Sequence, residues 1–265
     1  MEIQGYLSKM KVLQGDTILY SLNLDSNVEM NDLLGKKVKF TFLNEIQCVS
    51  CGKKTSKSFN QGFCYSCFIE APESAECIIR PELCRAHLGE GRDVEWEQAH
   101  HNQPHVVYLA ASDVVKVGVT RLTQMPTRWI DQGANSAIIL AETPNRYLAG
   151  VLEVELKNHF SDKTNWQKML KNVIDDSIEL VDTKWSLEEV LPQDLMEYFS
   201  EDDTIFEFNY PVTSYPEKIK SLSFDKETEI EGVLTGIKGQ YIYLDTERVL
   251  NIRKHTGYKI SIKIM

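Results

Sequence analysis

The pattern of apolar and polar positions predicts strands at both ends of the chain. Near the N-terminus, alternation with period two marks three strands: Ile3 to Tyr6, Thr17 to Leu24 and Lys37 to Leu43. Toward the C-terminus it marks two more: Tyr241 to Leu244 and Tyr258 to Ile264. Because neither end has enough strands to be stable alone, we expect residues 1–44 and 225–265 to pack together as one small β-barrel-like unit.

The middle of the chain has a different pattern. Residues 45–102 are rich in Cys, Gly, Ser and His and show little periodicity, which is typical of a module in which a metal ion replaces an apolar core. Residues 103–224 open with two apolar runs that predict a hairpin, Val106 to Ala110 and Val114 to Val119, and continue with helical spacing. We therefore expect an α+β fold: a zinc-ribbon-like module, an α/β domain with an acidic helical extension, and the terminal β unit.

Four cysteines in this middle segment have the spacing of a metal site. Cys48, Cys51, Cys64 and Cys67 form the pattern C-x2-C-x12-C-x2-C, and two such short loops can present four thiolates to one tetrahedral zinc ion. Gly52 directly follows the first pair and Gly62 shortly precedes the second. Both glycines allow tight turns in which backbone amides point at the sulfurs. Because all four positions are thiolates, the predicted zinc is structural.

A second, less regular group of metal-ligand residue types follows. Cys77, Cys84 and His87 lie within eleven residues, and His100 and His101 come shortly after. With His101 as the fourth ligand, or His100 in its place, these residues would form a second, closed zinc site of two cysteines and two histidines. The alternative is that the two cysteines are small buried apolar residues and the histidines lie on the surface.

Neither the charge nor the hydropathy of the chain excludes a nucleic-acid partner. The net charge is −10, but residues 171–235 alone hold 17 Asp and Glu against 5 Lys and Arg, whereas residues 36–70 and 236–265 are basic. The N-terminus lacks the pattern of a signal peptide, and no apolar run approaches the length of a membrane span. We expect a cytoplasmic protein that does not enter a membrane, in which the six cysteines stay reduced.

Residues 105–170 resemble the GIY-YIG endonuclease superfamily. The resemblance rests on Val107-Tyr108-Leu109, on Val115 to Thr120 with Gly118 at the centre, on Thr127-Arg128-Trp129, and on Glu153 followed by Leu156, Lys157 and Phe160. The whole chain, including the cysteine module, is also similar to an uncharacterised bacterial family known only as a domain of unknown function. That second resemblance implies no activity.

The first resemblance implies a set of catalytic roles. Glu153 would bind a catalytic Mg²⁺ or Mn²⁺ ion, Arg128 would stabilise the phosphate oxygens, and Tyr108 would help to deprotonate water. The family's second-strand tyrosine has no counterpart, because Val115 or Lys116 stands in its place. Lys116 could supply cationic stabilisation instead, and Asn165 lies where the family often has a polar active-site residue.

These observations lead to one functional hypothesis and two alternatives. The leading hypothesis is metal-dependent phosphodiester hydrolysis of DNA or RNA. The first alternative is a nucleic-acid-binding protein that keeps the fold for recognition and has no catalytic activity, which the missing tyrosine favours. The second alternative is a scaffold that binds other proteins through the acidic segment 171–235.

Overall fold

The computed structural model describes residues 2–157, 159–160 and 165–265, and it has the expected mixture of helices and strands. Its residues cluster into two compact units. The first unit contains Met1–Ile69, Ile130–Gly133 and Asn209–Met265, so it unites the two ends of the chain with the first cysteine module. The second unit contains Glu70–Trp129 and Ala134–Phe208, and it therefore holds the second group of cysteines together with the predicted hairpin.

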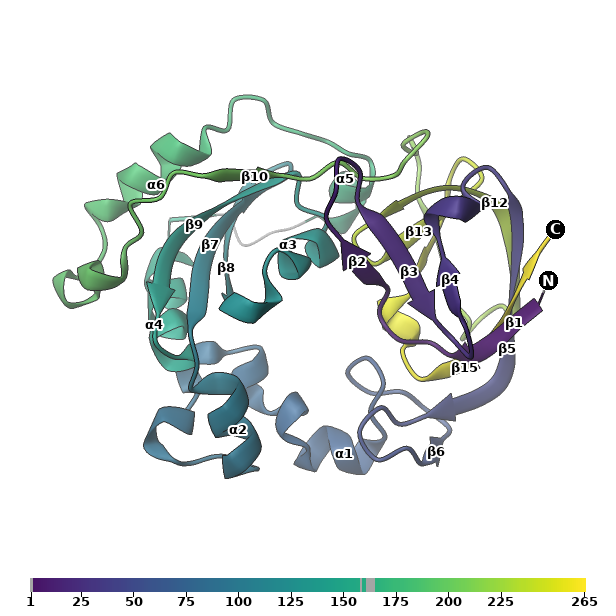
Figure 1. The fold of residues 1–265 in the computed structure, drawn as a ribbon, viewed down its shortest axis with the longest axis horizontal. Coiled ribbons are helices and arrows are strands. Elements are labelled where there is room, and N and C mark those ends of the chain that lie inside the picture. The colour runs from purple at the N-terminus through teal and green to yellow at the C-terminus, as the bar shows by residue number, and fades with distance from the viewer. Residues whose placement is uncertain (1, 158, 161–164) are drawn as a thin grey trace. The chain divides into compact units, whose positions relative to one another are not determined.

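The first unit is built on an eight-stranded sheet (Figure 1). Its strands follow the order β1-β15-β5-β12-β13-β14-β11, and β6 pairs with the end of β5. The strands are β1 (Glu2–Tyr6), β5 (Lys37–Gln47), β6 (Lys54–Thr55), β11 (Lys220–Leu222), β12 (Glu229–Lys238), β13 (Tyr241–Leu244), β14 (Arg248–Asn251) and β15 (Tyr258–Ile264). A separate three-stranded sheet contains β2 (Lys11–Leu13), β3 (Leu19–Asn23) and β4 (Asn27–Glu29).

The two ends of the chain pair in this sheet, but they do not close a barrel. β1 runs antiparallel to β15, with Ile3 opposite Ile262, and β15 and β12 both pair with the long strand β5. The apolar positions Val38, Phe40 and Ile260 are fully buried, so the period-two pattern identifies the inner face correctly. A barrel requires the first and last strands to pair, whereas among the described strands β1 pairs only with β15 and β11 only with β14. The expected β-barrel is therefore an open sheet.

The second unit contains a four-stranded sheet of order β10-β9-β7-β8. Its strands are β7 (His105–Ala111), β8 (Val115–Arg121), β9 (Ser136–Thr143) and β10 (Ile205–Glu207), and β7 and β8 form the expected antiparallel hairpin. Successive side chains of β7 point to opposite faces of the sheet. On one face Val107 and Leu109 belong to the main apolar core, and on the other Tyr108 contacts Trp129.

The helices Arg146–Lys157 and Leu180–Glu188 pack on this second sheet and complete its core. The α-helices among the described residues are α1 (Tyr65–Glu70), α2 (Val94–His101), α3 (Thr127–Gln132), α4 (Arg146–Lys157), α5 (Trp166–Leu170) and α6 (Leu180–Glu188). Leu187 on α6, Leu191 after its end and Leu195 in the 3-10 helix Gln193–Tyr198 are buried in the same core as Val107. In the part of the chain that the structure describes, no helix has both the length and the apolar character needed to span a membrane.

Candidate metal centres

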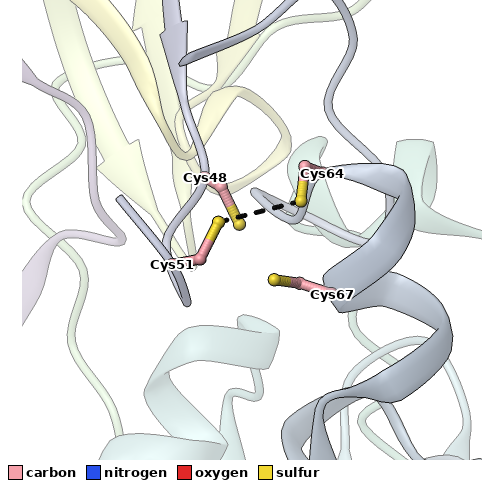
Figure 2. A group of neighbouring side chains, drawn as sticks. All are labelled: Cys48, Cys51, Cys64 and Cys67. Atoms are coloured by element: carbon pink, nitrogen blue, oxygen red, sulfur yellow. Dashed lines mark hydrogen bonds between the residues drawn. The ribbon is translucent and has the colours of Figure 1, made fainter. Parts of the chain in front are cut away.

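The four predicted cysteine ligands of the first site converge. Cys48 and Cys51 lie in the turn that follows β5, and Cys64 and Cys67 lie at the start of α1 (Figure 2). The four sulfurs point toward one another and lie within 4.8 Å of each other, and Cys51 Sγ is 3.9 Å from Cys64 Sγ. Zn–S bonds of ~2.3 Å in a tetrahedron place two sulfurs about 3.8 Å apart. The group therefore has the dimensions of a four-cysteine zinc site and could hold one zinc ion.

The backbone around Cys48 prepares this sulfur for metal binding. Gly52 and Gly62 have φ values of +70° and +127°, which side chains other than glycine rarely adopt. Burial raises the pKa of the Cys48 thiol, but hydrogen bonds donated by the N–H groups of Cys51, Cys64 and Ser50 lower it overall to about 6. Because the thiolate is the form that binds metal, Cys48 is ready to act as a ligand near neutral pH.

A second group, in the other unit, contains Cys77, Cys84 and His101. Cys77 lies in the 3-10 turn Glu76–Ile78, Cys84 follows the turn Pro81–Leu83, and His101 ends α2. The Nδ1 atom of His101 lies 3.9 Å from Cys77 Sγ and 3.6 Å from Cys84 Sγ. A tetrahedral zinc ion bound by sulfur and imidazole nitrogen separates these atoms by about 3.6 Å. All three residues are buried, and the three groups could hold a metal ion.

The two other histidines considered for this site lie differently. His87 stacks on Tyr147, with ring centroids 4.6 Å apart, and the Nδ1 atom of His87 is buried with no hydrogen-bond partner among the described residues. His100 stacks on Trp96 and directs its Nδ1 atom to the Trp96 carbonyl oxygen at 2.7 Å. The structure therefore gathers three of the four predicted ligands, and it selects His101 over His100.

Two residues that the sequence patterns did not single out lie against the second centre. Arg146, at the start of α4, donates hydrogen bonds to the carbonyl oxygens of Cys77 and Ile78 at 2.9 and 2.8 Å. Glu97 is buried, and its Oε2 atom lies 3.8 Å from His101 Nδ1. Glu97 precedes His101 by four residues on a helix, a spacing that places both side chains on one face and was available in the sequence.

Three of the residues implied by the GIY-YIG resemblance lie near one face of the second sheet. Tyr108 and Lys116 occupy even positions of β7 and β8 and share that face, and the Tyr108 hydroxyl lies directly over Gly118. Arg128 lies on α3 next to Trp129, which packs against Tyr108 at a centroid distance of 5.6 Å. The Nε atom of Arg128 is buried without a hydrogen-bond partner among the described residues. Burial lowers the pKa of the Lys116 ammonium group.

Glu153 comes from a helix on the opposite face of that sheet. Its helix, α4, packs through Leu152 and Leu156 into the core that contains Val107 and Leu109. The carboxylate is buried, its pKa is raised mainly by burial, and its Oε2 atom lies 3.4 Å from the Nζ atom of Lys157. Glu153 and Lys157, four residues apart on α4, thus form an ion pair. This pair is the alternative to metal binding at Glu153.

Asn165 has a structural contact of its own. Its side-chain oxygen accepts a hydrogen bond from the N–H of Gln167 at 3.0 Å and thereby caps the N-terminus of α5.

One family model matches most of the chain. It is described as a protein of unknown function, DUF2797, and it matches residues 35–260, a range that includes both candidate metal centres. The chain belongs to the DUF2797 family. Comparison with curated proteins and with solved structures gives no match. No family match supports the resemblance to GIY-YIG nucleases, so for this DUF2797 protein the nuclease assignment stays a hypothesis.

Proposed function

We propose that this DUF2797 protein binds single-stranded nucleic acid through the exposed surface of its four-cysteine module. The observation that carries the proposal is an aromatic and basic cluster beside the cysteines, which we call the knuckle face: Lys57, Phe59, Tyr65 and Phe68. The ring of Phe59 is stacked on Phe68 at 6.0 Å and meets Tyr65 edge to face at 5.5 Å. Lys57 Nζ lies 5.2 Å from the centre of the Phe59 ring.

The exposure of the knuckle face distinguishes it from a simple cover of the metal site. Phe63 is 8% exposed and already fills the module, whereas Tyr65 is 63% exposed. A large aromatic ring in water next to a lysine is the arrangement on which a base can stack while its phosphate meets a cation. Lys54 is paired with Glu45, but in the described part of the chain neither Lys53 nor Lys57 forms an ion pair. Both are therefore available for phosphate contacts.

The proposed role of zinc is to form this surface. Tyr65 and Phe68 lie on α1, a helix of six residues that is too short to be stable alone in water. The cysteines before and within its first turn tie α1 to the turn after β5 through the metal. Binding should consequently depend on the zinc of the four-cysteine site.

The direct test measures the affinity of the purified protein for fluorescent 20-nucleotide oligo-dT and oligo-rU by anisotropy at several salt concentrations. Tyr65→Ala is expected to raise Kd about tenfold, because stacking of one base contributes ~1–3 kcal/mol. Lys57→Gln is expected to weaken binding at low salt and to reduce the slope of log K against log salt by about one. Ser66→Ala, an exposed change on the same helix, is the matched control and should leave Kd unchanged.

Each variant must retain the metal content of the wild type. Absence of binding at low salt, or equal affinity in Tyr65→Ala and Ser66→Ala, would refute this proposal and leave the scaffold alternative ahead.

Phosphodiester cleavage is a second candidate function, favoured by the arrangement around Tyr108. Tyr108 and Lys116 share one face of the β7–β8 hairpin, and Arg128 lies on α3 beside Trp129, which packs against Tyr108. Mg²⁺ is commonly bound by one or two carboxylates together with substrate phosphates. The buried carboxylate of Glu153 could act as such a ligand in exchange for its ion pair with Lys157. Because Glu153 belongs to the helix on the other face of the sheet, phosphodiester cleavage ranks second to nucleic-acid binding.

Single-turnover assays on mixed-sequence DNA and RNA with Mg²⁺ or Mn²⁺ test this second candidate. If cleavage occurs, Glu153→Ala is expected to slow it about a hundredfold or more, because the metal loses its protein carboxylate, while binding of nucleic acid remains. Glu155→Ala is the control, since Glu155 is exposed and points away from Glu153 on the same helix. Equal rates in wild type and Glu153→Ala would rule out this assignment.

A further inference from the structure

The second metal centre differs from the first in the number of groups it gathers. The first centre has four thiolates, whereas the second has two cysteines and one histidine within 4.8 Å of one another among the described residues. Zinc is four-coordinate in most protein sites, and sites with three protein ligands keep their fourth position for water or substrate. A metal ion bound by these three residues would therefore have a fourth position that none of them fills.

A cavity reaches this centre. It has a volume of about 300 Å³, and Cys77 and Glu97 are among the residues that line it. The Oε1 atom of Glu97 accepts a hydrogen bond of 2.8 Å from the backbone N–H of Arg92, while Oε2 lies near His101. Gly91 is packed so closely that a Cβ atom there would lie 2.5 Å from the carboxylate. The Glu97 carboxylate is thus fixed at the point where the cavity meets the metal ligands.

We propose that the second centre is an open metal site in which Cys77, Cys84 and His101 hold the ion and the fourth position takes an exogenous ligand from this cavity. The ligand is a water molecule or a small molecule that carries a hydroxyl group. This class follows from Glu97, because a fixed carboxylate beside the ion accepts a hydrogen bond from a ligand that carries a proton and repels a ligand that is an anion without one. This proposal is independent of nucleic-acid binding by the knuckle face.

The positions of the two competing protein groups support an open site. His87 stacks on Tyr147 and lies outside the set of three ligands. Glu97 lies 3.8 Å from His101 Nδ1, whereas oxygen and nitrogen ligands of one tetrahedral zinc ion are about 3.3 Å apart. Its other oxygen is engaged by the Arg92 amide. Glu97 is therefore placed as a neighbour of the bound ligand rather than as a ligand itself.

The test uses the full-length protein with Co²⁺ in place of zinc and 2-mercaptoethanol as the probe. The thiol releases its proton to the buffer and binds an open site as a third thiolate, while the hydroxyl group of the probe can donate a hydrogen bond to Glu97. The sulfur-to-cobalt charge-transfer absorption should therefore increase and saturate with added thiol. The four-cysteine centre has no free position and should contribute no change. A Cys84→Ser protein, which lacks the second centre but retains the first, should show no such increase.

Two further variants identify the role of Glu97. Glu97→Gln is expected to keep two metal ions per chain and to weaken probe binding about tenfold, because the hydroxyl group of the bound probe loses its charged hydrogen-bond acceptor. Glu95→Gln, exposed on the same helix, should behave as the wild type. His87→Ala should also keep both ions. An unchanged spectrum of the wild type on addition of the thiol, or loss of one ion in Glu97→Gln or His87→Ala, would show a closed site and overturn the proposal.

Discussion

Replacement of Cys51 by serine is expected to remove one zinc ion per chain and to unfold the segment from Gly52 to Ile69. Cys51 is the exposed member of the four-cysteine group, so its substitution opens no cavity in the apolar core. The segment has little else to hold it: β6 has two residues and α1 has six. Structural zinc contributes roughly 10 kcal/mol or more to the folding of small metal-binding modules, which exceeds what these elements can replace.

Elemental analysis and hydrogen exchange together measure this effect. Zinc should fall by one equivalent relative to the wild type, and the amides of α1 should lose their protection while those of β7 and β9 keep theirs. Ser56→Ala, a change at an exposed position of the same segment, is the control and should retain the ion. Retention of full zinc content by Cys51→Ser would contradict the assignment of the four-cysteine centre.

The first metal centre could be predicted from the sequence because its geometry is local. A Cys-x-x-Cys pair forms its own turn, and two glycines with positive φ shape the backbone around the sulfurs, so spacing alone implies convergence. The second centre depends on tertiary structure. His101 reaches the cysteines because α2 packs beside the turns that carry Cys77 and Cys84, and no spacing rule distinguishes it from His87 or His100.

The arrangement around the hairpin shows a similar limit. The hairpin was predicted correctly, and alternation along β7 places Tyr108 and Val107 on opposite faces. The apolar stripe of α4 predicted a helix that packs on the sheet, but an amphipathic helix carries no information about which face it covers. Glu153 therefore could not be assigned to the side of Tyr108 from the sequence. The open sheet could not be predicted for a similar reason, because strand patterns do not specify which strands pair at a sheet edge.

A glycine in α4 gives the sharpest test of how the second unit supports its metal centre. Substitution of alanine for glycine inside an exposed helix stabilises a protein by up to ~1 kcal/mol. At Gly150, however, a Cβ atom would lie 2.2 Å from the backbone nitrogen of Glu82 and 2.3 Å from the carbonyl carbon of Pro81. Both are backbone atoms and cannot rotate away, so the turn Pro81–Leu83 must move.

We therefore expect Gly150→Ala to reduce the free energy of unfolding of the second unit by ~2–3 kcal/mol, the upper part of the typical range for overpacking. Because the displaced turn leads directly into Cys84, zinc should also dissociate more readily from the second centre while the four-cysteine centre keeps its ion. Urea unfolding of the metal-loaded protein and chelator competition measure the two effects. Val154→Ala, a change at an exposed position of the same helix, is the control and should shift stability by less than about 1 kcal/mol. Greater stability of Gly150→Ala than of the wild type would mean that the helix does not approach the turn this closely, and the support assigned to α4 for the second metal centre would have to be abandoned.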